Sequence, residues 1–577
     1  MTMTFTDRPG TFSPASGARH VSLKGAGKAR RDQTRSRIGL TMMAFMLVYC
    51  VIGGRLVMLG MSEQAAAGAR GSAASSVATA RPNIVDRNGE ILATDIKTSS
   101  LFAEPNKMVD PDEAAELITS VLTDIDADQL RKRLSTNAGF VWIKREITPK
   151  QQQELHNLGI PGVGFLTENR RFYPGGPAAA HIVGLVNIDN EGIAGIEKAI
   201  DERGLGDLHG AGFATKGADL QPVKLSIDMR VQHILRDELA GAMQRYQSLA
   251  AMGVIVNAKT GEVMAMASLP DFDPNNPVDA NKPDRLNRLT AGTYELGSVF
   301  KSFTFAMALD SGRVKMSDSI DARFPIRVGR QQIRDYRGKA RFLSVPEVFR
   351  YSSNIGTAKM ALAVGQEEQQ EYLKKLGLST RLKTDLPEVA TPQVPKRWSQ
   401  ATQLTVSFGH GIAITPMQAA MADVALVNGG YLLSPTFYPR TQEEAMASSA
   451  QVISKHTSDQ MRWLFRFNAV NGSGRNGDVQ GYVVGGKTGT AEKIVNGRYV
   501  EGTYLNSFLS TFPMDDPQYV MLITIDDPKP EKPGLPALAA WNAAKVSSNV
   551  VRRAADILGV RPRSESEGQP DALLVSY

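Results

Sequence analysis

The apolar segments of residues 221–562 have strand character at both ends of this region and helical character between them. MGVIVNAKTGEVMAMASLP (252–270) has the pattern of two strands around a turn, and LNSFLSTF (505–512) and YVMLITID (519–526) are short apolar runs rich in strand-forming residues. Residues 297–428 are instead rich in helical patterns. Because the strands come from distant parts of the sequence, we predict one α+β domain whose sheet is assembled from both of its ends.

The N-terminal region has the charge pattern of a membrane anchor. Residues 1–37 carry eight Lys or Arg and two Asp, and the next charged residue is Arg55. Residues 38–61 form a largely apolar segment that is long enough for a single helix to cross a bilayer. The basic residues before it are expected on the cytoplasmic side. We therefore predict a cytoplasmic tail at 1–37 and a transmembrane anchor at 38–61. A cleaved signal peptide is the alternative, but its apolar region is typically only about 7–15 residues long.

Charge and composition exclude several other classes of protein. The formal net charge is +7, and the basic tail carries nearly all of it, so the rest of the chain offers no electrostatic case for binding nucleic acid. Cys50 is the only cysteine, which excludes a disulfide framework. The sequence has no HExxH, no paired Cys or His ligands and no GxSxG, so a metal site and a Ser-His-Asp triad lack support. We expect neither a metal nor a cofactor.

Composition also divides the region between the anchor and the catalytic domain. Residues 62–80 consist mainly of Ala, Ser and Gly, which is typical of a flexible stem. Residues 81–220 alternate β-rich runs with turn signals and predict an α+β module without catalytic chemistry. Within it, we expect Arg170 and Arg171 to pack the module against the catalytic domain. The polar tail, residues 563–577, is expected to be disordered.

Three short motifs follow one another along the catalytic region. Ser298-Val299-Phe300-Lys301 opens an apolar helical segment, where a spacing of three residues puts the hydroxyl and the ammonium on one face. Serine needs a base to become a nucleophile, and lysine can serve when burial and a second cation lower its pKa. Ser352-Ser353-Asn354 and Lys487-Thr488-Gly489-Thr490 come next. Both recur, as Ser547-Ser548-Asn549 and Lys259-Thr260-Gly261, but these copies are out of order, and the second is predicted to be a hairpin turn.

The stretch GYVVGGKTGT (481–490) also matches the P-loop pattern of nucleotide-binding proteins. A P-loop needs a strand before its first glycine and a helix that starts at its lysine. Here a polar stretch precedes Gly481, and Tyr482-Val483-Val484 are strand formers inside the supposed loop. Asn496-Gly497 favours a hairpin after the lysine. We therefore interpret Lys487 as a strand residue that holds a carboxylate rather than a phosphate.

The motifs and their surroundings resemble one known family. YELGSVFKSFT, RYSSNIGTAKM and VVGGKTGTAEK, together with IVDRNGEILA (84–93), LSIDMRVQ (225–232) and SFGHGIAITPMQ (407–418), are similar to class B penicillin-binding proteins of the division-associated FtsI type. One departure is Leu296, where the family usually has proline. The resemblance implies a pedestal module like a penicillin-binding protein dimerisation domain. It also implies a transpeptidase domain with a central antiparallel sheet, flanking helices and an all-helical subdomain.

The resemblance also implies a reaction, which is acyl transfer at the D-Ala-D-Ala end of a peptidoglycan stem peptide, with β-lactams as covalent inhibitors. Ser298 would attack the carbonyl and Lys301 would be the base. Ser352 would relay a proton to the leaving amine with the help of Lys487. Asn354 would orient the substrate amide and the base. His410 is expected near the cleft, but not as a base, because lysine already fills that role.

Substrate binding is implied in the same way. The backbone N–H groups of the nucleophile and of Thr490 would form the oxyanion hole. Lys487, Thr488 and Thr490 would hold the terminal carboxylate, for which a cation and hydroxyls are suitable partners. Ser353 belongs to the same substrate-binding set. Gly489 would leave room for substrate beside the strand.

Partners and location also follow from the resemblance. It implies donor and acceptor stem peptides, a membrane-embedded glycan polymerase of FtsW type, other division proteins, and a periplasmic catalytic domain held by the inner membrane at the septum. No glycosyltransferase module fits before residue 220. The alternatives are a D,D-carboxypeptidase or β-lactamase on the same fold, and a catalytically silent division scaffold or β-lactam sensor.

Overall fold

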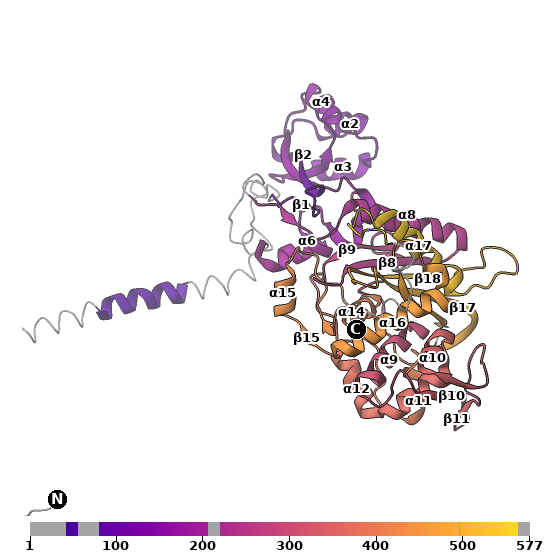
Figure 1. The fold of residues 1–577 in the computed structure, drawn as a ribbon. Coiled ribbons are helices and arrows are strands. Elements are labelled where there is room, and N and C mark those ends of the chain that lie inside the picture. Colours follow the sequence, from indigo (N-terminus) through magenta and orange to yellow (C-terminus); the bar gives the residue numbers. More distant parts are fainter. Residues whose placement is uncertain (1–41, 56–79, 206–219, 330, 496, 564–577) are drawn as a thin grey trace, which may run out of the picture. The chain divides into compact units, whose positions relative to one another are not determined.

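The computed structural model describes residues 42–55, 80–205, 220–329, 331–495 and 497–563 (Figure 1). The predicted basic tail, nearly all of the predicted stem and nearly all of the predicted disordered tail lie outside these residues.

The chain divides into two units, Met1–Ser76 and Val77–Tyr577. In the first unit, residues 42–55 form a helix with exposed side chains. They fall inside the predicted anchor at 38–61, whose other residues lie outside the described part of the chain. No helix among the described residues is long and apolar enough to cross a membrane.

Residues 80–205 contain an α+β module built on one sheet. The long strands β2 and β4 are antiparallel partners, and β3 and β1 also pair with β2. Three helices pack on the sheet and bury apolar side chains such as Leu101, Ile118 and Leu130. The bounds are β1 Ile84–Val85, β2 Ile91–Ala103, α2 Pro111–Val121, α3 Ala127–Leu134, β3 Val141–Ile147, α4 Pro149–Asn157, β4 Val163–Phe172, α5 Ala180–Val183, β5 Leu185–Val186, β6 Gly192–Ala194 and α6 Gly195–Ile200, and β7 Val223–Lys224 pairs with β1.

A buried cluster of charges holds this module together. Arg171, whose side chain is 1% exposed, lies 2.6 Å from Glu197 and 3.0 Å from Asp95. Arg81 lies 2.8 Å from the same glutamate. Buried ion pairs persist only where hydrogen bonds compensate for the lost hydration, as they do here. Arg171 therefore has a structural role, but its charged partners lie within the module and not in the catalytic domain. Arg170 pairs with a glutamate of β3.

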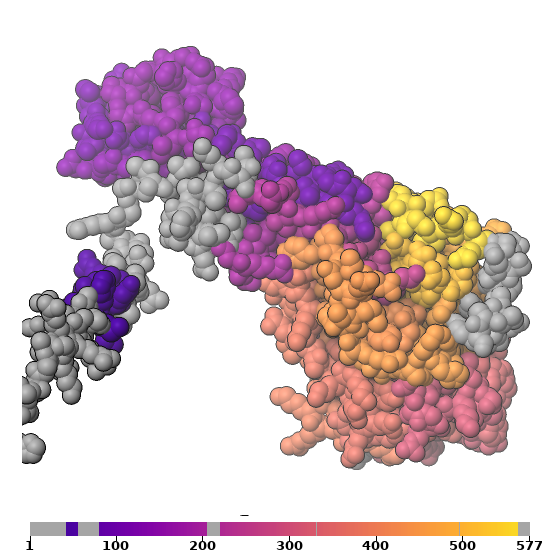
Figure 2. Space-filling view, turned by 60° about the vertical axis from the view of Figure 1, so that its left-hand side comes forward, coloured from indigo at the N-terminus to yellow at the C-terminus, as the bar shows by residue number. Residues whose placement is uncertain are grey.

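The catalytic domain contains the predicted sheet assembled from distant segments. Its order is β16-β17-β18-β8-β9, and every neighbouring pair is antiparallel. The bounds are β8 Ala250–Asn257, β9 Val263–Leu269, β16 Gly485–Val495, β17 Arg498–Phe512 and β18 Tyr519–Asp526. In Figure 2 the magenta, orange and yellow segments of this domain lie against one another. β16 is therefore an edge strand, and β8 lies inside the sheet.

Helices cover both faces of this sheet (Figure 1). α8 (Met229–Tyr246) and α17 (Ala543–Ala554) pack on one face, with Leu235, Ile523 and Val550 in a shared core. On the other face, the core joins side chains of α9, α14 and α16 to those of the sheet. These helices and their neighbours are α9 Lys301–Asp310, α10 Val345–Tyr351, α11 Asn354–Val364, α12 Gln366–Lys375, α13 Gln400–Val406, α14 Pro416–Val427, α15 Gln442–Ala447 and α16 Lys455–Asn471, with a small sheet of β14 Tyr431–Leu432 and β15 Ala450–Gln451.

Two expectations about local structure are wrong. The subdomain that was expected to be all-helical contains two two-stranded sheets, made of β10 Ser319–Asp321, β11 Ile326–Val328, β12 Gln331–Ile333 and β13 Phe342–Ser344. Three-residue strands are too short to produce a periodic pattern. Tyr482-Val483-Val484, expected to form a strand, lie outside any strand, and Val483 has φ +40°. The strand begins at Gly485. The predicted turn at Lys259-Thr260 is confirmed between β8 and β9.

Candidate active site

Ser298 lies in a single 3-10 turn, Gly297–Phe300, which leads directly into α9 at Lys301. The serine is half-buried and the lysine is 1% exposed. The helical path continues from the turn into α9, so the two side chains keep the spacing of three residues that the sequence predicts. The turn begins at Gly297 with φ +52°, a backbone conformation that other residues rarely adopt.

Two further glycines seat this turn against its surroundings. A Cβ on Gly489 of β16 would stand 2.4 Å from the carbonyl oxygen of Leu296 and 3.0 Å from the amide nitrogen of Val299. A Cβ on Gly409 would stand 2.3 Å from the carbonyl oxygen of Gly297. The sequence explained Gly489 by the space that substrate needs. In the structure, its missing side chain lets the nucleophile turn approach the strand.

Two buried lysines converge on the hydroxyl of Ser352. The Nζ of Lys301 lies 3.1 Å from Ser352 Oγ and 2.5 Å from its carbonyl oxygen. The Nζ of Lys487 lies 3.0 Å from the same Oγ. Ser352 itself has left-handed backbone angles, φ 54° and ψ 45°. Such strain in a residue other than glycine costs roughly 1–3 kcal/mol and is concentrated at functional sites.

The electrostatics distinguish the two lysines. Burial holds the pKa of Lys301 well below its usual range, the charge of Lys487 lowers it further, and Asp335 opposes both effects. Burial alone lowers the pKa of Lys487 to about 7. Both lysines therefore have a lowered pKa, and Lys301 is the one for which a second buried cation is among the causes. A lysine whose pKa is lowered by burial and by a second cation can serve as the base for a serine hydroxyl.

Asp335 fixes the second motif, and the sequence did not predict it. Its two carboxylate oxygens accept hydrogen bonds from Ser353 Oγ at 2.7 Å and from the backbone N–H of Ile355 at 2.9 Å. Ser353 in turn caps α11 by accepting from the backbone N–H of Gly356. Asp335 occurs in a stretch of charged residues that resembles an exposed loop, and only a tertiary contact brings it to the motif.

Asn354 is the first residue of α11, and its side chain makes a different contact from the expected one. Its Nδ2 donates to the backbone carbonyl of Arg334 at 2.9 Å. The sequence predicted a contact between this amide and Lys301, and the contact that the amide makes is with Arg334 instead. Its role toward substrate stays a prediction.

The hydroxyls of the third motif lie on the face of β16 opposite to Lys487, because side chains alternate along a strand. Thr488 Oγ1 lies 2.7 Å from Ser473 Oγ, and Thr490 Oγ1 accepts from the backbone N–H of Ala539 at 3.2 Å. Ser473 is a further polar neighbour that the sequence did not identify. The backbone of Thr490 lies beside the nucleophile turn, since a Cβ on Gly297 would stand 2.9 Å from its carbonyl oxygen.

The repeated copies of the motifs lie outside the site. Lys259, in the turn between β8 and β9, pairs with Asp516 at 2.9 Å. Ser547 is buried on α17, 3.1 Å from Ser510 Oγ. Among the described residues, no group of three or more His, Cys, Asp or Glu side chains has the arrangement of a metal site.

This arrangement is typical of one class of protein, the serine acyl-transfer enzymes in which lysine can serve as the base. Comparison with known families places the chain within that class. Residues 251–547 match the penicillin binding protein transpeptidase domain, and residues 76–207 match the penicillin-binding protein dimerisation domain. The chain therefore belongs to the penicillin-binding proteins with a transpeptidase domain, which confirms the resemblance seen in its sequence.

Individual relatives span nearly the whole chain. A probable peptidoglycan D,D-transpeptidase FtsI from Caulobacter vibrioides is 38% identical over 561 residues, which cover 95% of this chain and 92% of the relative. The stage V sporulation protein D of Bacillus subtilis is 31% identical over 92% of this chain and 87% of its own length. The peptidoglycan D,D-transpeptidase FtsI of Escherichia coli K12 is 27% identical over 87% of each chain.

Proposed function

We propose that this protein is a peptidoglycan D,D-transpeptidase that cross-links stem peptides of the septal cell wall and that β-lactams inhibit it covalently. The convergence of two buried lysines on Ser352 Oγ is the observation that carries this proposal. The family assignment and the names of the relatives support it.

The proposed reaction has two steps. In the first, Lys301 takes the proton of Ser298, whose Oγ bonds to the carbonyl carbon of the penultimate D-alanine. The peptide C–N bond breaks, and the terminal D-alanine leaves as an amine after receiving a proton through Ser352. In the second step, an amine of another stem peptide bonds to the acyl carbon and gives up one proton, the ester bond breaks, and Ser298 Oγ takes up one proton.

The remaining groups are assigned to substrate positioning. The backbone N–H groups of Ser298 and Thr490 form the oxyanion hole, where fixed donors stabilise the developing negative charge. Lys487, Thr488 and Thr490 bind the terminal carboxylate. Asn354 orients the substrate amide. Ser353 and Gly489, assigned to substrate binding on the sequence, support this set through the α11 cap and the close approach of strand and turn.

We also propose the cellular arrangement that the sequence predicts. Residues 38–61 anchor the chain in the inner membrane, the tail at 1–37 is cytoplasmic, and the catalytic domain works in the periplasm. A membrane-embedded glycan polymerase of FtsW type and other division proteins are the proposed partners. Protease treatment of intact spheroplasts tests this topology, because only the part after the anchor should be digested.

Labelling with a fluorescent penicillin tests the reaction. We expect a stable covalent adduct at Ser298 that is absent in Ser298→Ala and slow to form in Lys487→Ala. Lys259→Ala is the matched control, because it removes the lysine of the copied Lys-Thr-Gly and should label normally. Labelling that persists in Ser298→Ala would contradict the site. Rapid loss of the adduct would favour a β-lactamase, and D-alanine release without cross-linking would favour a carboxypeptidase.

A further inference from the structure

A basic insert lies between the first and second motifs. Residues 322–341 contain seven Arg or Lys and a single acidic residue, Asp335, although the chain after the N-terminal tail is almost neutral as a whole. The insert comprises β11, β12 and the loops that join them to β10 and β13. In Figure 1, β10 and β11 lie at the edge of the catalytic domain beside α11. Positive charge is therefore concentrated on one element of this domain.

Four cations of the basic insert have no carboxylate partner among the described residues. Arg323 pairs with Asp321 at 2.9 Å, and Arg341 pairs with Glu347 at 2.5 Å. Arg330 lies outside the described residues. The remaining cations are all exposed, and they are Arg327, Arg334, Arg337 and Lys339. Like charges this close together repel one another, and an anionic partner would relieve the repulsion.

The basic insert is joined directly to the second motif. Besides the carboxylate contacts described above, the backbone carbonyl of Arg334 accepts from the side-chain amide of Asn354 at 2.9 Å. Lys339 Nζ stands 4.9 Å from the ring centroid of Tyr351, the residue immediately before Ser352. The unpaired cations therefore begin at the rim of the active site.

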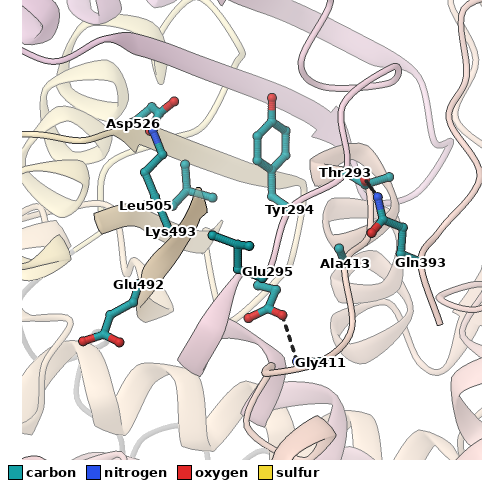
Figure 3. A pocket seen from close by; sticks show the side chains of 11 residues that line it. Thr293, Tyr294, Glu295, Gln393, Gly411, Ala413, Glu492, Lys493, Leu505 and Asp526 are labelled. Carbon is teal, nitrogen blue, oxygen red and sulfur yellow. Dashed lines mark hydrogen bonds and ion pairs between the residues drawn. The ribbon is translucent and has the colours of Figure 1, made fainter. Parts of the chain in front are cut away.

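A different wall of the site carries the opposite charge. The cavity of about 430 Å³ beside the nucleophile turn is lined by three carboxylates, those of Glu295, Glu492 and Asp526 (Figure 3). The lysine in its lining, Lys493, lies 2.5 Å from Asp526 and is paired with it. A long anion bound near Ser298 would therefore be repelled from this wall and attracted to the basic insert.

Exposed aromatic rings accompany the cations. Phe324 is 67% exposed, Tyr336 is 78% exposed and Phe342 is 48% exposed. The guanidinium carbon of Arg323 lies 4.4 Å from the ring centroid of Phe342, and that of Arg337 lies 5.7 Å from the ring of Tyr336. Aromatic side chains and arginine are enriched in binding surfaces. Flat rings beside cations suit a partner that has both apolar faces, such as those of sugar rings, and anionic groups.

The proposed function supplies a polymer with the complementary charge. Each stem peptide that has not been cross-linked ends in a free carboxylate, which is ionised at neutral pH, so a glycan strand with many such peptides is a polyanion. A stem peptide that reaches Ser298 brings its neighbours on the same strand to the rim of the site. Several weak contacts along one strand add up to a useful affinity, and this does not require a closed pocket.

We propose that the basic insert is an exosite for the cell-wall polymer, and that its four unpaired cations bind free carboxylates of stem peptides next to the one that reacts at Ser298. The inference rests on the proposed transpeptidase function and adds a second binding surface to it. This surface contacts the polymer away from the reacting atoms, so its contribution is to strand affinity.

Binding of fluorescently labelled, uncross-linked peptidoglycan strands to penicillin-acylated protein tests the exosite. In the fully acylated full-length protein the adduct occupies the active site, so the remaining affinity reports on other surfaces. The triple variant Arg327→Ala, Arg337→Ala, Lys339→Ala removes three of the unpaired cations. We expect it to raise the Kd for strands roughly tenfold, because three exposed charge contacts are lost. The wild-type Kd should also rise between about 0.05 and about 0.2 M NaCl.

Two controls identify the surface and the group that it binds. The matched triple variant Lys315→Ala, Lys374→Ala, Lys383→Ala removes three exposed lysines from the same domain and should leave the Kd within twofold of wild type. Strands whose carboxylates have been converted into methylamides should bind the wild type roughly tenfold more weakly. Equal loss of affinity in the two triple variants, or equal binding of treated and untreated strands, would overturn the exosite.

Further outcomes separate the exosite from the function on which it rests. If penicillin labels the wild type at Ser298 but the first triple variant binds strands as tightly as the wild type, the exosite is wrong and the transpeptidase stands. Failure of wild-type labelling contradicts the function itself. If acylated wild type binds poly-L-glutamate but not strands, and the first triple variant loses that binding, the insert recognises an acidic protein segment and the polymer assignment is overturned.

Discussion

Replacing Gly489 by alanine should slow acylation of Ser298 while leaving the fold in place. The added Cβ would stand 2.4 Å from the carbonyl oxygen of Leu296, which is 1.0 Å inside the 3.4 Å at which ordinary contact begins. It would also stand 3.0 Å from the backbone nitrogen of Val299. Both atoms belong to the backbone around the nucleophile, so no flexible side chain can yield. The turn must move about 1 Å from β16, and a misplacement of this size can cost about 100-fold in rate.

The assay is the second-order rate of labelling by a fluorescent penicillin, measured together with the melting temperature. Gly241→Ala in α8 is the matched control, because a Cβ there meets nothing within 4 Å. We expect Gly241→Ala to label at the wild-type rate. If the labelling rate of Gly489→Ala is within threefold of the wild-type rate, a glycine at position 489 is not needed to place the nucleophile turn beside β16. A slow but stably folded Gly489→Ala protein supports the reasoning.

Three further predictions concern charge. The acylation rate should rise with pH as Lys301 loses its proton and should level off well below pH 10, because burial lowers the pKa of this base; a rate that still climbs steeply above about pH 9 would contradict this. Asp335→Asn should lower the maximal acylation rate roughly tenfold, because it weakens the hydrogen bond to Ser353. It should also shift the rise of the acylation rate to lower pH, because the Asp335 carboxylate raises the pKa of Lys301. Asp321→Asn is the control: it removes an exposed carboxylate from β10 and should leave the pH at which the acylation rate rises unchanged. Burial raises the pKa of Asp423 to about 8, so the folded state holds a proton that the unfolded state releases, and stability should fall as pH rises from about 4 to 8. Asp423→Asn should remove this pH dependence and raise the free energy of unfolding at pH 8, measured in urea, by more than about 1 kcal/mol. If the variant instead loses the same stability at pH 4 and at pH 8, the protonation of Asp423 does not determine stability.

The sequence predicted the parts of the site that depend on local spacing and chain order. Ser298 and Lys301 are neighbours on one helical path, and Lys487 follows on a strand, so their placement needed little tertiary information. Most of the sheet was also predictable, because β8, β9 and β18 are buried apolar runs that stand out from the polar connections. The family resemblance added the roles of these residues.

Other features depend on contacts between distant segments, which no local pattern encodes. Asp335 reaches Ser353 only because the β10–β13 insert folds over the start of α11. Glu295 has no distinctive neighbours in sequence. Its carboxylate accepts hydrogen bonds from the backbone N–H of Gly411 and from Tyr499 Oη, which belong to two other segments of the chain. The close approach of Gly489 to the backbone of the nucleophile turn was not predicted, since a strand pattern does not reveal which backbone packs against it.

The antiparallel pairing of β8 with β18 has a consequence for how the protein is made. Ala250 pairs with Asp526, 276 positions later in the chain. At synthesis rates of about 5–20 residues per second, β8 is synthesised roughly 14–55 seconds before the end of β18. Throughout this interval one edge of β8 is open, and β16, which carries Lys487, is joined to β8 only through β17 and β18. The nascent chain therefore has no site for a β-lactam to acylate, and a chain that ends before β18 should be a client for chaperones and proteases rather than a weakened enzyme.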